Sequence, residues 1–352
     1  MMRGAHLLSL LLCNVGMVSY GAPTAATRYS YTLSLDKDTS PVVSILNEKG
    51  KGYTPCQYTF NPAWIAPSTG TNGTAGILVR AAKCPEAFGG AEDHILMAKC
   101  DADTGRCEDI LPTKFPFEEG AQDPRVVFEE ASGFYFLFYF ANGQGQSTVY
   151  LRRSKTPFIP DSWERISTPQ PWHRNGCSFP LTAKKEGTPW YIIVGEAPNP
   201  GLPAIGLWKS IDGFQSFIPV NKSYLPVSKD PKQPEVVVEA STPVVELSTG
   251  DFLHLYSAGT PGWVANGNYT AGWVVIDKDS PNTIIQRSET HILVASLPFE
   301  GVEPVGGYPV QRYRTTFVTS IVPIGKDKFR LYWGAADANI ASGILTVVPR
   351  AQ

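Results

Sequence analysis

The 352-residue chain lacks an excess of charge of either sign. Its 30 Lys and Arg residues nearly balance its 32 Asp and Glu residues, which leaves a formal net charge of −2. A strongly basic surface is what recruits a protein to nucleic acid or to an anionic membrane. We therefore expect neither nucleic acid nor a membrane among its partners. Charged residues make up only 18% of the chain and aromatic residues 11%, a balance that suits a large all-β body with an aromatic-lined site for a neutral ligand.

Long hydrophobic runs are absent after the N-terminal region. Arg3 is followed by an apolar stretch from Leu7 to Val18, and small residues stand near Gly21 and Ala22. This stretch is shorter than the ~20 apolar residues that a membrane-spanning helix needs. A charged start, a short apolar middle and a small-residue exit are typical of a secretory signal peptide. We expect a signal peptide over residues 1–22 and a soluble, secreted, extracellular protein.

Cysteine is scarce, and one of the six, Cys13, lies within the expected signal peptide. The five others are Cys56, Cys84, Cys100, Cys107 and Cys177. Cys100 and Cys107 flank a six-residue turn, so we predict a disulfide between them; Cys56 with Cys84 is the second predicted pair, which leaves Cys177 over. Three Asn-X-Ser/Thr sequences, at Asn72, Asn221 and Asn268, would accept N-glycans on a eukaryotic secretory route, and a bacterial route would leave them bare.

Several catalytic signatures are missing as well. The sequence contains no Gly-x-Ser-x-Gly elbow, no P-loop and no dinucleotide fingerprint. Its histidines outside the signal region are scattered without the spacing of metal ligands. We therefore expect no metal and no cofactor.

Helical periodicity is nearly absent, and short apolar runs separated by Gly, Pro, Asn and Asp take its place. Pairs of such runs begin near Asn61, Asp123, Phe179, Thr242 and Thr316, at intervals of ~60 residues. One such unit cannot bury its faces alone, whereas radial stacking of several units can. The sequence thus predicts an all-β, single-domain, five-bladed β-propeller, with a β-sandwich as the alternative. We place an N-terminal extension and the start of the propeller in residues 23–57 and the catalytic propeller in residues 58–352.

A short motif offers the first candidate chemistry. Gln122-Asp123-Pro124-Arg125 comes directly before an apolar run and places a carboxylate two residues from a guanidinium. An aspartate can give or take a proton at a sugar oxygen, and an arginine can bind hydroxyls or anions with two donors. The alternative is a turn that caps a strand with a surface ion pair. In a propeller, loops and strand ends of every blade converge at one end of the central channel, so distant motifs can meet there.

Four further segments stand elsewhere along the chain, one before this motif and three after it. They are Asn61-Pro62, Ser178-Phe179-Pro180, the stretch from Tyr269 through Asp279-Ser280-Pro281 to Arg287-Ser288, and Tyr332-Trp333-Gly334-Ala335-Ala336-Asp337. Together with Asp123-Pro124-Arg125 they resemble glycoside hydrolase family 130, the five-bladed propellers that act on β-mannosides as phosphorylases or hydrolases. The resemblance covers roughly residues 58 to 345. It implies an oligosaccharide or polysaccharide substrate, and we expect a monomer.

The resemblance assigns roles to individual residues. It makes Asp123 the general acid, which protonates the glycosidic oxygen directly or through a sugar hydroxyl. Asp337 and Asn61 would bind the substrate, although a turn aspartate and a strand cap are the structural alternatives. Arg125 would hold either the backbone or a sugar hydroxyl. The full set of substrate-binding residues that we predict is Asn61, Arg80, Arg125, Arg174 and Asp337.

Departures from the family pattern bear on the reaction. Gln122 stands where the family usually has a glutamate, and Glu239 occupies the place of a phosphate-binding histidine. Arg174 is the candidate for the phosphate-binding lysine, and a solvated loop at His173-Arg174 is the alternative. Hydrolytic relatives place a glutamate near this point to activate water. An inverting hydrolase needs an acid and a base ~6.5–9.5 Å apart, and we predict Asp123 and Glu239 as this pair. Asp123 should be kept protonated by apolar neighbours, and Glu239 should be ionised in a wetter place. A secreted protein gains nothing from conserving a sugar phosphate, which favours hydrolysis over phosphorolysis.

Two alternatives remain. The first is a carbohydrate-binding propeller that has kept the sugar site but lost one carboxylate, which the presence of Gln122 favours. The second is a hydrolase of the arabinanase and fructosidase clan, but that reading lacks a convincing aspartate near the start of the first unit.

Overall fold

The computed structural model describes most of the chain after its N-terminal region. The described residues are 29–44, 52–54, 56–86, 90, 92–111, 115–141, 148–167, 174–178, 189–195, 204–261, 268–302 and 307–352. The expected signal peptide, residues 1–22, lies outside them, as does Phe179, which we expected to open the third repeat. Within these residues the protein is a five-bladed β-propeller, which confirms the predicted fold class.

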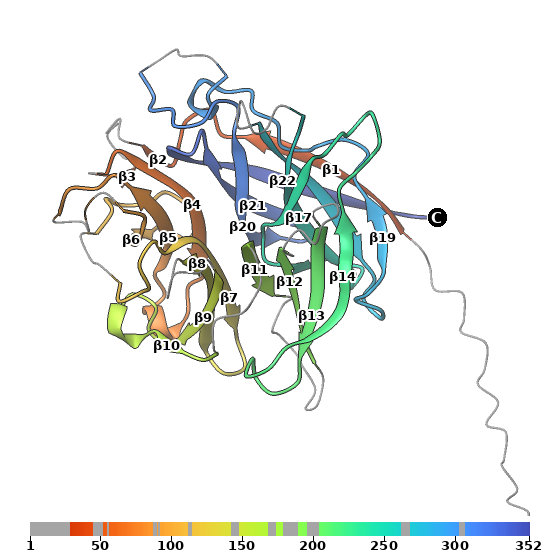
Figure 1. Cartoon of the computed structure of the whole chain (residues 1–352), viewed down its shortest axis with the longest axis horizontal. Helices are drawn as coiled ribbons and strands as arrows, with labels where there is room; N and C mark the ends of the chain where they lie inside the picture. Colours follow the sequence, from red (N-terminus) through yellow and green to blue (C-terminus); the bar gives the residue numbers. More distant parts are fainter. Residues whose placement is uncertain are drawn as a thin grey trace, which may run out of the picture.

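Five antiparallel sheets, numbered here as blades 1 to 5, follow one another along the chain and surround a common centre (Figure 1). Blade 1 consists of β4 (Tyr58–Ile65), β5 (Ala75–Ala82) and β6 (His94–Cys100). Blade 2 consists of β7 (Gln122–Glu129), β8 (Phe134–Ala141), β9 (Thr148–Ser154) and β10 (Glu164–Arg165). Blade 3 consists of β11 (Arg174–Ser178), β12 (Trp190–Gly195), β13 (Ala204–Ser210) and β14 (Ile218–Pro226).

The last two blades are larger. Blade 4 consists of β15 (Val237–Ala240), β16 (Val245–Glu246), β17 (Phe252–Gly259), β18 (Tyr269–Ile276) and β19 (Ile284–Arg287). Blade 5 consists of β20 (Thr316–Gly325), β21 (Lys328–Ala335), β22 (Asn339–Ala351), β1 (Tyr29–Lys37), β2 (Val43–Ser44) and β3 (Gly52–Tyr53). The first strands of the blades lie nearest the centre, where β4 contacts both β7 and β20.

The first strand of the chain closes the ring. β1 pairs with β22 over nine residues, from Tyr29 opposite Ala351 to Lys37 opposite Gly343, so both ends of the described chain lie in blade 5 (Figure 1). Lys37 Nζ also lies 2.9 Å from the fully buried carboxylate of Glu300, which accepts a bond of 3.1 Å from the indole of Trp333. The N-terminal extension therefore supplies the outer strand of the last blade.

The hydrophobic core lies between neighbouring blades. β8 is apolar or aromatic at every position, and most of its side chains are buried because another blade covers each face. One cluster joins Leu78 and Met97 of blade 1 to Val126, Leu137 and Tyr139 of blade 2. A single blade leaves such residues exposed to water, and burial of each large side chain stabilises the fold by roughly 1.5–3 kcal/mol. Interblade packing thus explains why the sequence repeats one type of unit five times.

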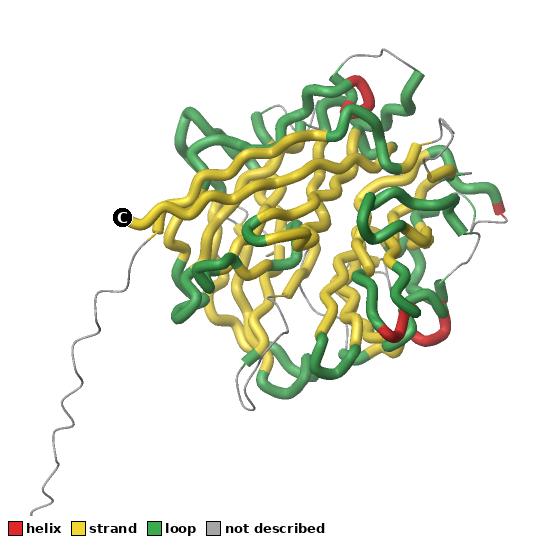
Figure 2. Tube along the Cα trace, turned by 180° about the vertical axis from the view of Figure 1, so that it is seen from behind, coloured by secondary structure: helices red, strands yellow, loops and turns green. Residues whose placement is uncertain are grey.

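Strands and loops make up nearly the whole described chain (Figure 2). The helical turns described are three short 3₁₀ segments: η1 (Thr69–Thr71), η4 (Pro160–Ser162) and η5 (Pro298–Glu300). None of the helices in the described part of the chain has the length and apolar character needed to cross a membrane.

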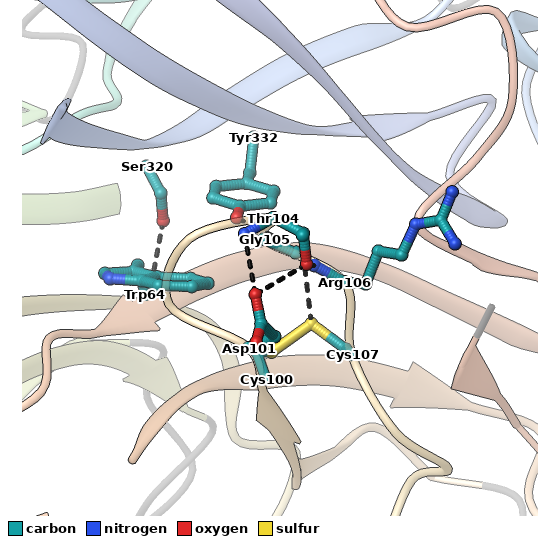
Figure 3. Close-up of a disulfide and its surroundings, with 9 residues drawn as sticks. All are labelled: Trp64, Cys100, Asp101, Thr104, Gly105, Arg106, Cys107, Ser320 and Tyr332. Atoms are coloured by element: carbon teal, nitrogen blue, oxygen red, sulfur yellow. Dashed lines mark hydrogen bonds between the residues drawn. A yellow bond between two sulfur atoms is a disulfide. The ribbon is translucent and has the colours of Figure 1, made fainter. Parts of the chain in front are cut away.

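Both predicted disulfides are present, and both belong to blade 1. Cys56 is bonded to Cys84, and Cys100 is bonded to Cys107 across the turn that follows β6 (Figure 3). The turn packs against blade 5, where the Tyr332 hydroxyl donates to the carbonyl of Gly105 at 3.4 Å. Tyr332 also stacks on Trp64 of β4, with ring centroids 5.2 Å apart. Cys177 lies in β11, but its side chain is outside the described part of the structure.

Candidate active site

The predicted site residues whose side chains are described come from four different blades. Asn61 lies in β4 of blade 1, Asp123 in β7 of blade 2 and Glu239 in β15 of blade 4. Asp337 lies in the turn between β21 and β22 of blade 5. Asn61 lies within β4 at a break in its pairing with β5, and Asp123 lies at a similar break near the start of β7.

Asp123 is held by two groups from blade 1. Asn61 Nδ2 donates a hydrogen bond of 2.8 Å to Asp123 Oδ1, and Arg80 Nη1 lies 3.1 Å from the same oxygen. Burial alone would raise the pKa of Asp123, but the charges of Arg80 and Arg125 and the bond from Asn61 outweigh it, and the pKa is lowered. Asp123 is therefore a carboxylate in the free protein. Our expectation that apolar neighbours keep it protonated is wrong, because its neighbours are cations and donors.

Arg80 connects Asp123 to a second carboxylate. Its Nη2 lies 2.7 Å from Asp93 Oδ2, and its guanidinium covers the ring of Phe60 at 4.8 Å from the centroid. Burial opposes the charge on Arg80, yet the surrounding carboxylates prevail and raise the pKa of the guanidinium. Arg80 thus brings a permanent positive charge to the site and is fixed in place from both sides.

Asp337 has the opposite electrostatic character. Burial raises its pKa to about 6, the charges of Asp123 and Glu239 add to the increase, and Arg80 and Arg312 only partly offset it. Arg312 Nε lies 3.3 Å from Asp337 Oδ2. Asp337 is therefore the carboxyl group of this site that exchanges a proton near neutral pH. The charges of Asp123 in blade 2 and Glu239 in blade 4 thus both act on Asp337 in blade 5.

Glu239 is buried rather than wet, which corrects our expectation for its surroundings. Only 3% of the residue is exposed, and the Tyr269 hydroxyl donates a bond of 2.5 Å to Oε1. Tyr269 packs edge-on against Phe317, with ring centroids 5.2 Å apart. A strand of blade 4 and an aromatic contact to blade 5 therefore fix the orientation of this carboxylate.

Arg125 is completely buried beneath Asp123. It donates to the backbone carbonyls of Asp123 at 2.8 Å and Pro124 at 3.1 Å, and Nε donates to the carbonyl of Ser241 in blade 4. These bonds join the segments that carry Asp123 and Glu239. Of the two roles we considered for Arg125, the structure favours that of holding the backbone.

Sequence reasoning missed three residues of this arrangement: Asp93, Tyr269 and Arg312. Tyr269 opens a segment that marks the family resemblance, which was the one available signal for it. Asp93 and Arg312 stand in no motif, and only the tertiary structure brings them to Arg80 and Asp337. The side chain of Arg174 lies outside the described part of the structure. Among the described residues, no three His, Cys, Asp or Glu side chains are grouped to hold a metal ion.

No family model matches the chain, and no curated protein matches its sequence. Solved structures do match its fold. A β-1,2-mannobiose phosphorylase from Listeria innocua, in complex with β-1,2-mannobiose, has a TM-score of 0.68 at 16% identity and covers 88% of this chain and 96% of its own. A putative glycoside hydrolase from Bacteroides ovatus has a TM-score of 0.65 at 19% identity, covering 88% and 95%. These similarities establish a shared propeller fold.

A third solved structure bears on the reaction class. Its description says that the GH130 family of mannoside phosphorylases contains glycoside hydrolases that target β-1,2 mannosidic linkages in Candida mannan. Its TM-score is 0.67 at 18% identity, with 88% of this chain and 93% of the other covered. Proteins of this fold therefore include both phosphorylases and hydrolases.

Proposed function

We propose that the protein is a secreted glycoside hydrolase that cleaves β-mannosides, or a related neutral glycan, with inversion at the anomeric carbon. The observation that carries the proposal is a set of carboxyl groups held in fixed orientations on three blades: Asp123 by Asn61 and Arg80, Glu239 by Tyr269, and Asp337 by Arg312. The charges of Asp123 and Glu239 both add to the raised pKa of Asp337. Hydrolysis of a glycoside requires paired carboxyl groups in different protonation states. The fold similarity to mannoside-active enzymes supports the substrate class.

Two assignments of the acid are consistent with this arrangement. In the first, Asp123 donates the proton, as the family resemblance implies, and Glu239 activates the water. In the second, Asp337 donates it, because its pKa of about 6 leaves a protonated fraction near neutral pH, while Asp123 stays ionised beside Arg80. We take the first assignment as primary, since a bound sugar would displace water from Asp123 and oppose its charge. Asn61, Arg80, Arg312 and Asp337 would bind sugar hydroxyls.

The charges of the site support water rather than phosphate as the nucleophile. The charges of two described arginines are balanced by carboxylates: Arg80 by Asp93 and Asp123, and Arg312 by Asp337. Arg125 is wholly buried and donates to backbone carbonyls. A phosphate dianion needs cations whose charge is not already balanced. Glu239 would also repel it at the position where phosphorylases carry a histidine.

Secretion is part of the proposal. Two disulfides support an oxidising compartment, because disulfides persist in secreted proteins and are rare where thiols are kept reduced. Asn72, at the end of η1, is exposed and accessible to glycosylation, while Asn221 and Asn268 are half-buried. Treatment of the protein from a eukaryotic host with an N-glycosidase should increase its mobility, and an N72Q variant should lack one of the glycans.

The central test is incubation with a panel of manno-oligosaccharides, with and without inorganic phosphate. We expect free mannose in both conditions and no dependence on phosphate. Release of a sugar phosphate would replace hydrolysis by phosphorolysis. Binding without any product would favour the carbohydrate-binding propeller.

Three variants then identify the acid and the base. D123N, D337N and E239Q should be compared on a disaccharide and on an aryl β-mannoside with a good leaving group, which needs no general acid. We expect D123N to lose about 100-fold or more on the disaccharide and much less on the aryl substrate, whereas E239Q should lose activity on both. If D337N shows the substrate-dependent loss instead, Asp337 is the acid. Full activity of E239Q would remove Glu239 from the mechanism.

A further inference from the structure

Gly334, at the end of β21, lies against Asn61 of blade 1. A Cβ atom at position 334 would approach Asn61 Oδ1 to 2.0 Å and the Asn61 backbone nitrogen to 3.0 Å. Real side chains do not tolerate the shorter distance, so a methyl group here requires Asn61 to move.

Asn61 has little freedom to move. It is 3% exposed, its backbone is left-handed with φ of 48°, and its Nδ2 donates to Asp123 at 2.8 Å. Its Oδ1 has no hydrogen-bond partner in the described part of the protein and rests against Gly334. The amide must point its NH₂ group at the carboxylate, because only that end can donate. Any rotation that relieves the clash at Oδ1 therefore breaks the bond to Asp123.

We propose that Gly334 is a positioning residue: the absence of a side chain at this position lets the Asn61 amide stand against blade 5 and hold the Asp123 carboxylate in its reactive orientation. The consequence for catalysis rests on the proposed function, but the effect on Asp123 does not. The chain of contacts runs from blade 5 through blade 1 to blade 2, so it also links the orientation of Asp123 to the closure of the ring.

A matched control exists in the same blade. A Cβ at Gly343 would approach the backbone oxygen of Asp36 to 2.6 Å, which is also too close. Gly343 pairs with Lys37 of β1, the outer strand of the blade, and contacts none of the site residues described above. G343A therefore overpacks blade 5 without touching Asn61.

The test uses G334A, G343A, N61G and the double variant N61G/G334A. Glycine adopts the left-handed backbone of Asn61 without strain, and N61G removes the side chain that the methyl group would strike. We expect G334A to lower kcat/KM about 10- to 100-fold, the cost of a small misplacement of a catalytic group. G343A should retain the wild-type kcat/KM even if its melting temperature falls. The double variant should lie close to N61G, because the contact at 2.0 Å is then gone and the alanine meets only the backbone nitrogen of residue 61, at 3.0 Å.

A second readout needs no substrate. The titration of the Asp123 side-chain carboxyl carbon can be followed by NMR, with D123N identifying the signal. Asn61 helps to lower the pKa of Asp123, so G334A, N61G and the double variant should all raise it to a similar extent, and G343A should leave it unchanged.

Three outcomes would overturn the proposal. Two of them are an unchanged pKa of Asp123 in G334A and an unchanged kcat/KM in G334A. The third is that G334A lowers kcat/KM in the N61G background as much as it does in the wild type. If G334A does not fold, recovery of the fold in N61G/G334A supports the clash with Asn61, and continued failure to fold contradicts it. A wild type that cleaves no glycoside while the titrations shift as expected would refute the proposed function and leave the role of Gly334 in place.

Discussion

Three residues of the candidate site share an unusual backbone. Asn61, Asp123 and Asp337 all have positive φ angles, of 48°, 54° and 49°. Asn and Asp enter this left-handed region more readily than other residues with side chains, but the conformation still stores some strain. Such strain persists only where the surrounding structure determines the position, and here neighbouring blades do so. The polar side chains are thus oriented by two strand irregularities, at Asn61 and Asp123, and by the turn that carries Asp337.

The raised pKa of Asp337 makes a prediction for stability. A carboxyl group whose pKa is about 6 in the folded state and 3.8 in the unfolded state binds more protons when folded. Stability is then lost as the pH rises from about 4 to about 6. D337N removes this loss, so we expect the variant to be more stable than the wild type at pH 7.5, by about 1–2 kcal/mol, and to lose the advantage at pH 4.

Urea denaturation at both pH values measures this difference. E246Q is a suitable control, because Glu246 is exposed on blade 4 and has no part in the site. A D337N protein that is less stable than the wild type at pH 7.5 would show that the ion pair with Arg312 outweighs the burial of the carboxylate.

At the scale of elements, both disulfides stabilise blade 1, the three-stranded sheet. The Cys56–Cys84 bond closes a segment with a sequence separation of 28, and the Cys100–Cys107 bond one of only 7. In the chain-entropy description, the disulfide that closes the longer loop stabilises the folded state by about 3.5 kcal/mol, and the disulfide that closes the shorter loop by about 2.5 kcal/mol. We expect C56S/C84S to lower the free energy of unfolding more than C100S/C107S.

Denaturant midpoints of the two double variants give this comparison directly. The hairpin closed by Cys100 and Cys107 also touches blade 5, where Tyr332 donates to the carbonyl of Gly105 at 3.4 Å. If C100S/C107S lowers the denaturant midpoint more than C56S/C84S does, the contacts that this hairpin makes in the folded state contribute more to stability than the difference in loop entropy.

At the scale of the whole molecule, stability depends on closure of the ring. β1 contributes nine residue pairs with β22, and Lys37 places its ammonium on the buried carboxylate of Glu300. A chain that begins at residue 38 exposes the edge of β22 and leaves Glu300 without its cation. We expect this chain to melt at least 10 °C lower and to unfold over a broader range, since loss of several kcal/mol shifts the melting temperature by roughly this amount.

Calorimetry of the shortened chain, with K37M in the full chain as the control for the ion pair alone, separates the strand from the charge. A shortened chain with the wild-type melting temperature would mean that β1 is an accessory strand and that the ring closes through blades 1 and 5 without it.

The prediction succeeded wherever the signal lay within a short stretch of chain. The apolar run of β8 and the turn between Cys100 and Cys107 are local features, and the structure confirms both. The prediction failed on the surroundings of Asp123 and Glu239. Asp123 lies beside Arg80 of another blade, and Glu239 lies beneath Tyr269, a residue 30 positions away in the chain.

The all-β repeat, the number of blades and the pairing of four cysteines could be predicted from the amino-acid sequence, because hydrophobic patterns and loops act between residues that are close along the chain. The raised pKa of Asp337, the sharing of Arg80 between two carboxylates and the contact of Gly334 with Asn61 became apparent only in the folded protein. Those properties depend on distances between blades, and charge, burial and steric contact act through space.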